Sequence, residues 1–184
     1  NSHPHRVGTI TLVHNGIIEN YNELKKELIE KGYNFISDTD TEIISAVLDN
    51  IKKSEKDNVT AISKLTKILE GSYALGIIFD DDFDSLYAVK KDSPLIVGVC
   101  SNCKLIASDV TAIINHTKKY MLIDDYEIVK LTKDNIDIYN NKLDIVDKKI
   151  LEVDWDVNQA KKNGFKEGIK ATIDLFMTIL KIEI

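Results

Sequence analysis

The fold of this chain is decided by the stretch Leu12-Val13-His14-Asn15-Gly16-Ile17-Ile18-Glu19-Asn20. The apolar, β-branched run 9–13 predicts a short buried strand. Asn15-Gly16 favours a turn with positive φ, so we expect the strand to stop there. Asn20, with Glu23 three residues later, resembles a capping box and predicts the start of a helix.

Asn15 and Gly16 are also candidates for chemistry. A side-chain amide and a glycine N–H come together at the expected end of a strand, and such donors stabilise a negative oxygen that develops during a reaction. The same pair fits a plain structural turn. On Asn15-Gly16 alone, both interpretations stay open.

The rest of the chain predicts helices first and strands afterwards. Apolar residues at helical spacing predict three helices. The first covers 20–31, the second follows the polar segment 37–41 and extends to residue 51, and the third begins after residue 58 and ends at Gly71. After Gly71 the spacing of the apolar residues changes from a period of about 3.6 to a period of 2. This predicts a meander of antiparallel strands over 73–79, 85–90, 95–100 and 104–107. A short helix is expected to start at Ser108-Asp109, with further strands at 120–122, 127–131 and 136–139. Helices stacked on antiparallel sheets predict a layered α+β domain.

Composition excludes several classes of protein. With 184 residues, 43% of them hydrophobic, the chain suits one domain with a sizeable core. A net charge of −6 argues against a nucleic-acid-binding face. We find no apolar run of about 18 residues and no signal peptide in Asn1-Ser2-His3-Pro4-His5, so we expect no membrane contact and a cytoplasmic location.

Cysteines and histidines raise the alternatives of a redox or metal site. Cys100 and Cys103 are spaced Cys-x-x-Cys, but no second pair exists and the segment resembles a hairpin, so we expect two reduced thiols. His3 and His5 have a spacing that suits zinc, yet no third ligand follows in a recognisable pattern. We therefore expect no metal and no cofactor.

Several separated motifs, taken together, resemble one family. In chain order they are Asn1-Ser2-His3-Pro4-His5, residues 14–20, Ser37-Asp38-Thr39-Asp40-Thr41-Glu42, Gly71-Ser72-Tyr73-Ala74, Ser93-Pro94-Leu95 and Ala107-Ser108-Asp109. Over residues 1–160 their order and spacing resemble the class II glutamine amidotransferase domain. The motifs at 15–20 and 39–42 favour the glutaminase half of the glutamine–fructose-6-phosphate aminotransferases. We expect a partial domain of this type over 1–165 and a divergent helical tail over 166–184.

The resemblance implies a fold and a set of site residues. The fold is the four-layer αββα sandwich of the N-terminal-nucleophile hydrolases, here incomplete at its N-terminal end. By position, Asn15 and Gly16 match the oxyanion hole, and Asp40 matches the carboxylate that pairs with the substrate's α-ammonium group. His3 matches a histidine near the substrate. From the residues alone, Asp40 also fits a simple helix cap.

The nucleophile of the family is an N-terminal cysteine whose own α-amine is the base. The resemblance places it, with an arginine-containing loop, in a segment before Asn1. Cys100 and Cys103 lie inside the chain and have no free α-amine. We therefore expect the chain as given to be inactive towards glutamine.

The resemblance implies a function with defined partners. Glutamine hydrolysis would supply ammonia for the synthesis of glucosamine 6-phosphate from fructose 6-phosphate. The fructose 6-phosphate would bind a second domain. A homo-oligomer is compatible with this function. Two alternatives stay open: a non-catalytic remnant that only binds, and the amidotransferase domain of another glutamine-dependent enzyme, such as one of purine or asparagine synthesis.

Overall fold

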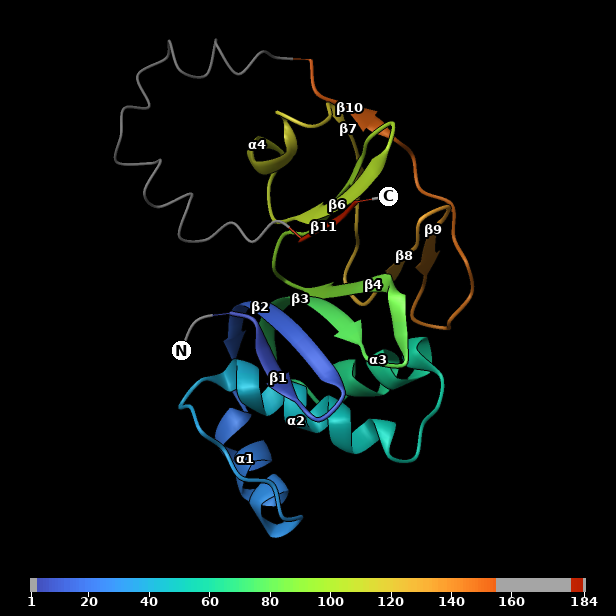
Figure 1. Ribbon diagram of the computed structural model, residues 1–184. Coiled ribbons are helices and arrows are strands. Elements are labelled where there is room, and N and C mark those ends of the chain that lie inside the picture. The colour runs from blue at the N-terminus through green and yellow to red at the C-terminus, as the bar shows by residue number, and fades with distance from the viewer. Residues whose placement is uncertain (1–2, 155–179, 184) are drawn as a thin grey trace, which may run out of the picture.

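Two antiparallel sheets face each other and helices cover their outer faces (Figure 1). The computed structural model describes residues 3–154 and 180–183. Three helices lie on the outer face of the first sheet: α1 (Tyr21–Glu30), α2 (Asp40–Lys52) and α3 (Asn58–Thr66). A fourth, α4 (Val110–Ile113), lies against the second sheet. This is the predicted αββα order of layers, and the α+β fold class is confirmed.

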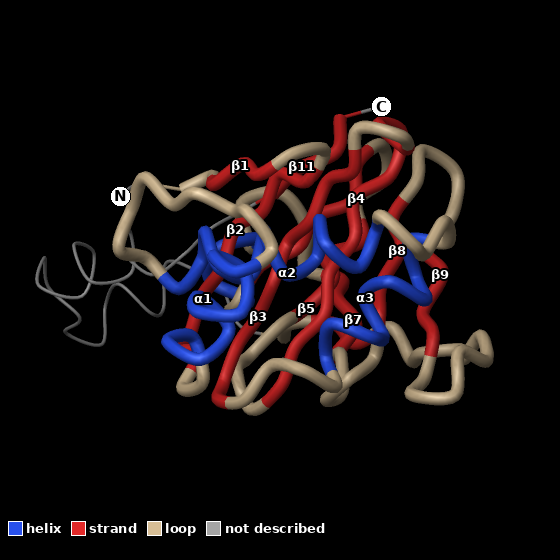
Figure 2. The backbone as a smooth tube through the Cα atoms, turned by 90° about the horizontal axis from the view of Figure 1, so that it is seen from below, coloured by secondary structure: helices blue, strands red, loops and turns tan. Residues whose placement is uncertain are grey.

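Within residues 3–154 and 180–183, the first sheet has six strands in the order β1-β2-β3-β4-β8-β9. They are His5–Val7, Ile10–Ile18, Gly71–Phe79, Asp82–Lys91, Ile128–Leu131 and Ile136–Tyr139. The second sheet has the order β10-β7-β5-β6-β11. Its strands are Leu151–Glu152, Lys119–Leu122, Ile96–Val99, Cys103–Ala107 and Leu180–Glu183. Figure 2 shows α1, α2 and α3 lying across the face of the sheet that contains β2 and β3.

Strand β2 does not stop at Asn15-Gly16, so the predicted turn is wrong. The strand continues to Ile18, with Gly16 opposite Tyr73 of β3. Gly16 does have a positive φ of 130°, but it has this conformation within the β2–β3 ladder. A Cβ at this position would lie 2.1 Å from the Ser72 carbonyl oxygen. Glycine is required by the close approach of two backbones and not by a turn.

Helix α1 begins after Asn20 as predicted, but the capping box does not form. The Asn20 backbone has φ −88° and ψ 15°, which is not the extended conformation of a capping residue, and its side chain makes no cap hydrogen bond. Its amide instead donates to the Ile68 carbonyl at 2.8 Å and accepts from the Glu70 N–H at 3.1 Å. Asn20 therefore ties the start of α1 to the segment that leads into β3.

The predicted single meander is also wrong, because the chain changes sheets. β3 and β4 form a hairpin in the first sheet, whereas β5 and β6 form a hairpin in the second. Both β4 and β5 are buried on both faces, so each needs a layer on either side. The short strands predicted at 120–122, 127–131 and 136–139 exist, but they are divided between the sheets.

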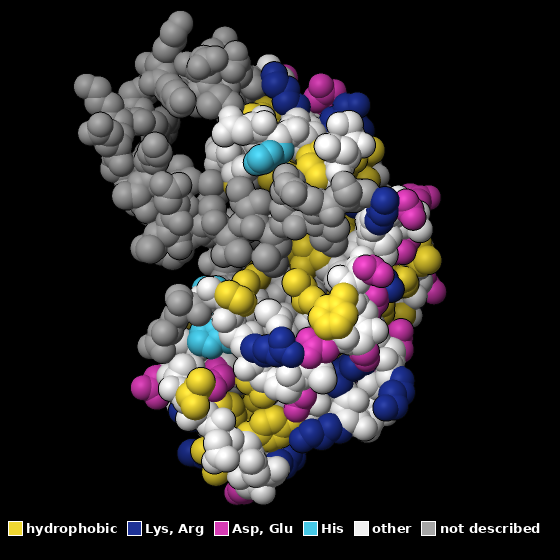
Figure 3. All heavy atoms as spheres, viewed as in Figure 1, with side chains coloured by type: hydrophobic (Ala, Val, Ile, Leu, Met, Phe, Trp, Pro, Cys, Tyr) yellow, Lys and Arg dark blue, Asp and Glu magenta, His cyan; other side chains and the backbone are white. Residues whose placement is uncertain are grey.

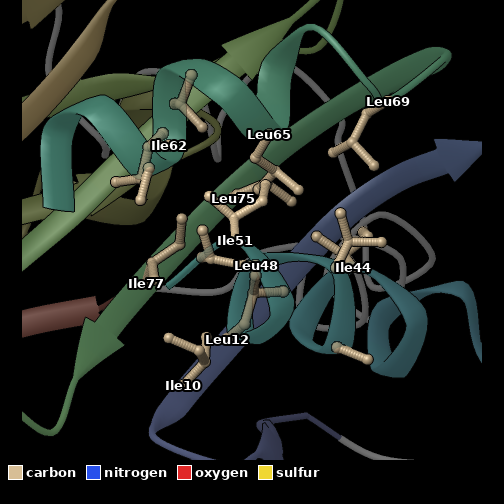
Figure 4. Close-up of a cluster of buried hydrophobic side chains, with 14 of the residues drawn as sticks. Ile10, Leu12, Ile44, Leu48, Ile51, Ile62, Leu65, Leu69, Leu75 and Ile77 are labelled. Carbon is tan, nitrogen blue, oxygen red and sulfur yellow. The ribbon is translucent and has the colours of Figure 1, made fainter. Parts of the chain in front are cut away.

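Among the residues that the structure describes, three apolar clusters fill the spaces between the four layers. The first cluster packs α1–α3 against β2 and β3. Figure 4 shows side chains of α2 and α3 packed against side chains of β2 and β3. The second lies between the two sheets, and the third lies between the second sheet and α4. In β3, Leu75 and Ile77 belong to the helix-side cluster and Ala74 to the inter-sheet cluster, as the alternation of a strand requires.

Cys100 and Cys103 are joined in a disulfide, so the prediction of two reduced thiols is wrong. The β5–β6 hairpin brings their Cα atoms to 5.0 Å, and the Cys100 N–H donates to the Cys103 carbonyl. This Cα separation lies within the range that a disulfide needs.

The predicted helical tail over 166–184 is wrong at Leu180–Glu183, which form β11 antiparallel to β6. Figure 1 shows the two strands side by side. The remainder of that tail lies outside the described residues. Within the described parts of the chain, no helix is long and apolar enough to cross a membrane.

Two glycines allow a test of the contact between β2 and β3. Gly71 has φ 118°, and an added Cβ would lie 2.3 Å from the Ile17 carbonyl oxygen of β2. Gly32 has φ 89°, with no atom within 4 Å of such a Cβ. Both substitutions strain φ, but only Gly71→Ala also forces the strands apart. We expect Gly71→Ala to lower the free energy of unfolding by at least about 2 kcal/mol more than Gly32→Ala, measured by denaturant titration. Equal losses would contradict this role of the strand contact.

Candidate active site

A cleft of about 430 Å³ opens where four segments of the chain meet. These segments are His3 before β1, residues 14–18 of β2, Tyr21 of α1, and residues 38–41 at the start of α2. In Figure 3, histidine and acidic side chains lie together at the left of the lower half of the molecule, on the side where Figure 1 places the N-terminus. All four residues predicted for the site, His3, Asn15, Gly16 and Asp40, line this one cleft.

The cleft is held together by contacts between β2 and the start of α2. The Ile18 N–H at the end of β2 donates to Asp40 Oδ2 at 3.0 Å. Asp40 is the first residue of α2, so this hydrogen bond fixes the start of the helix to the end of the strand. Thr39 Oγ1 lies 3.3 Å from His5 Nε2, which ties the same segment to β1.

Asp40 is held as a carboxylate. Its side chain is 24% exposed, and His14 Nδ1 lies 3.5 Å from its Oδ1. Burial acts to raise the pKa of Asp40, but contacts with the His14 imidazole and the Ile18 N–H outweigh it and lower the pKa below its ordinary value. The cleft therefore contains a fixed negative charge at neutral pH.

Asn15 lies between two spaces. It lines the cleft, and it also lines a smaller cavity of about 30 Å³ between the sheets, whose other walls include Ala74, Leu95 and Ile106. Gly16 beside it is exposed in the cleft. A hydrogen-bond donor and a carboxylate are thus available in the same cleft.

Glu42 fixes the wall of the cleft formed by the loop before α2. Its buried carboxylate accepts from the Ile36 N–H at 3.1 Å, the Ser37 N–H at 2.7 Å and the Ser37 hydroxyl at 2.5 Å. Burial acts to raise the pKa of Glu42, and these hydrogen bonds outweigh it, so that the pKa is lowered. These hydrogen bonds hold the loop residues Ile36 and Ser37 against the first turn of α2.

His3 has an electrostatic environment that favours the neutral imidazole. Burial, followed by the nearby His5 and His14, lowers its pKa, while Asp40 acts in the opposite direction. A neutral His3 adds no positive charge to the cleft that contains the Asp40 carboxylate.

Sequence reasoning missed part of this site. It assigned no site role to His14, Tyr21, Thr41 or the Ile18 N–H. A signal for His14 exists in the alternation of β2, which puts His14 on the helix side with Leu12 and Ile18. A buried imidazole there needs a hydrogen-bond partner, and the facing helix supplies it.

The comparisons with known proteins agree with this arrangement. A family model described as a glutamine amidotransferase domain matches residues 3–115. The chain belongs to this family. The match includes every residue of the cleft described above.

Full-length relatives are similar over most of this chain. The glutamine–fructose-6-phosphate aminotransferase of Clostridium perfringens is 46% identical over 91% of this chain, which spans 27% of that protein. The enzyme of the same name from Caldanaerobacter subterraneus is 46% identical over 90%, again spanning 27% of its length. This chain therefore corresponds to about a quarter of the relatives that it matches.

A solved structure supports the fold alone. The glutamine phosphoribosylpyrophosphate amidotransferase of B. subtilis has a TM-score of 0.63 and 19% identity, and the match covers 74% of this chain and 30% of that one. The two proteins share the αββα arrangement.

Glu42 predicts a specific acid sensitivity. The pKa of Glu42 is lower in the folded state than its ordinary value of 4.5, so the unfolded state binds more protons in acid. The stabilising effect of Glu42 is therefore complete above about pH 4.5 and is lost as the pH falls through the pKa of the folded state. Glu42→Gln should lower the free energy of unfolding by about 2 kcal/mol at pH 7 through loss of charge-assisted hydrogen bonds. The difference from the unsubstituted protein should shrink below pH 4.5, in urea titrations across pH. Glu27→Gln, on the exposed face of α1, is the matched control, and a difference that does not change with pH would contradict the assignment.

Proposed function

We propose that this chain forms the substrate-binding part of a glutaminase. Its ammonia would serve the synthesis of glucosamine 6-phosphate from fructose 6-phosphate. The observation that carries the proposal is that one cleft contains both a fixed carboxylate, Asp40, and a side-chain amide donor, Asn15. Glutamine offers the complementary groups, an α-ammonium at one end and a side-chain carbonyl at the other.

Asp40 is assigned to the α-ammonium group of glutamine. The hydrogen bond from the Ile18 N–H to Oδ2 would hold the carboxylate in place before the substrate arrives, so that little conformational entropy is lost on binding. The ammonium group is present in the substrate and in the transition state alike. Its contact with Asp40 therefore contributes mainly to binding.

Asn15 and Gly16 are assigned to the oxyanion hole. The side-chain amide of Asn15 and the backbone N–H of Gly16 would donate to the oxygen that becomes negative when the glutamine amide is attacked. The full charge exists only in the tetrahedral intermediate. Asn15 should therefore act on the rate of the chemical step.

His3 is assigned to substrate binding. It lines the same cleft, and its lowered pKa keeps it neutral at pH 7. A neutral imidazole can hydrogen-bond to glutamine without repelling the α-ammonium group.

The remaining parts of the reaction are assigned to a longer protein. In the family the nucleophile is an N-terminal cysteine, and the sugar phosphate binds a second half. The relatives named as glutamine–fructose-6-phosphate aminotransferases, of which this chain spans 27%, support the same division. Fructose 6-phosphate and a homo-oligomeric assembly thus belong to the proposal for the whole enzyme.

A chimera tests the role of Asn15. The segment that precedes the matching region in the Clostridium perfringens relative is joined before Asn1, and ammonia release from glutamine is measured. Asn15→Ala should lower kcat by about 10²–10³, the usual effect of removing one oxyanion donor, with little change in KM. If the chimera binds glutamine with no turnover, the chain is a binding module and the glutaminase assignment is wrong.

Asp40→Asn should give the opposite kinetic pattern in the same chimera. Loss of the ammonium contact should raise KM for glutamine by about tenfold or more and leave kcat almost unchanged. Asp84→Asn, an exposed position of β4 at the other end of the sheet, is the control. A fall in kcat alone in Asp40→Asn would show that the two roles are reversed.

A further inference from the structure

His14 is buried beside Asp40, and the roles proposed above do not use it. Its side chain is 2% exposed and lies on the helix side of β2. Asn15, the next residue, lines the cavity between the sheets. Because successive side chains of a strand point to opposite faces, one short segment places an imidazole under α2 and an amide at the cleft.

The two nitrogens of His14 have different surroundings. Nδ1 lies 3.5 Å from Asp40 Oδ1 and 3.3 Å from Thr41 Oγ1, both at the start of α2. Nε2 is buried and has no hydrogen-bond partner within residues 3–154 and 180–183. The polar contacts of the ring are thus concentrated on one nitrogen.

This asymmetry selects a tautomer. A buried N–H without an acceptor is rarer in proteins than a buried acceptor without a donor, so the proton is better placed on Nδ1. Nδ1–H then faces two oxygens, Thr41 Oγ1 at 3.3 Å and Asp40 Oδ1 at 3.5 Å, of which only the Asp40 oxygen carries a negative charge.

Both oxygens of Asp40 are consequently held by β2. Oδ1 faces His14 Nδ1, and Oδ2 accepts from the Ile18 N–H at 3.0 Å. These two anchors lie on either side of Asn15 and Gly16 in the sequence. The spacing between the carboxylate and the oxyanion donors is therefore fixed by five consecutive residues of one strand.

We propose that His14 is a positioning residue that orients Asp40 to receive the α-ammonium group of the substrate. The proposal rests on the function proposed above, because it takes the ligand of Asp40 to be an α-ammonium group. It predicts that His14 affects the binding of amides that carry this group and does not affect those that lack it.

The contact itself is tested without substrate, in the 184-residue chain. Carbon-13 NMR measures the pKa of the Asp40 carboxyl in His14→Leu, which has no donor, and in His14→Asn, whose amide nitrogen can take the place of Nδ1. The pKa of Asp40 should rise in His14→Leu, because the hydrogen bond that favours the carboxylate is lost, and stay near its original value in His14→Asn. An unchanged pKa in His14→Leu overturns the proposal. If His14→Leu does not fold, His14→Gln replaces it, because its amide reaches the position of Nε2 and not that of Nδ1.

The consequence for binding is tested in the chimera with two substrates. Glutamine carries the α-ammonium group, and glutaramate is the same amide without it. His14→Leu should raise KM for glutamine about tenfold, leave KM for glutaramate unchanged and change kcat by less than about twofold, with His14→Asn restoring most of the loss. An equal rise in KM for both substrates overturns the proposal, because a general structural defect would act on both.

The two readouts separate failure of this inference from failure of the proposed function. If Asp40→Asn raises KM equally for glutamine and glutaramate, the assignment of Asp40 to the ammonium group is wrong. The positioning role of His14 is then wrong as well. If Asp40→Asn does distinguish them and His14→Leu does not, the function stands and the role of His14 alone is wrong.

Discussion

The hydrogen bond from the Ile18 N–H to the Asp40 carboxylate fixes the start of helix α2 at the end of strand β2. It joins the central layer of the fold to the helical layer at one point. The loop before α2 is then held by Glu42, and β1 is held through the contact between His5 and Thr39. The walls of the cleft are thus parts of the scaffold itself, which suits a site that must bind its ligand with little rearrangement.

Strand β2 divides the polar side chains of the cleft between its two faces. His14 lies under the helices, 3.3 Å from Thr41 and 3.5 Å from Asp40, whereas the next residue, Asn15, belongs to the opposite face of the strand. Gly16 lets β2 run close to Ser72 and Tyr73 of β3 without leaving the ladder. A side chain at Gly16 would separate the strands and move the neighbouring donor, so the same glycine supports both the sheet and the site.

The four-layer arrangement follows from burial on both faces of the sheets. The first sheet packs against α1–α3 on one side and against the second sheet on the other, and both interfaces are apolar. An antiparallel sheet of this kind has no face free for water. The polar cleft therefore lies at the ends of strands, where backbone groups and the start of a helix are available.

Much of the fold was determined by the sequence alone. The three long helices and most of the strands follow from hydrophobic periods of 3.6 and 2, and the positive φ of Gly16 follows from its residue type. The order and spacing of separated motifs were enough to predict the amidotransferase family and the residues that line the cleft.

Only the tertiary structure decided how these elements combine. It placed β5 and β6 in a second sheet, continued β2 through Asn15-Gly16, joined Cys100 to Cys103, and brought His14 against Asp40. The physical reason is that a periodic pattern specifies which face of an element is buried but not which element covers it. That choice depends on contacts between residues far apart in the chain, such as His14 and Asp40, whose 26-residue separation has no local signature.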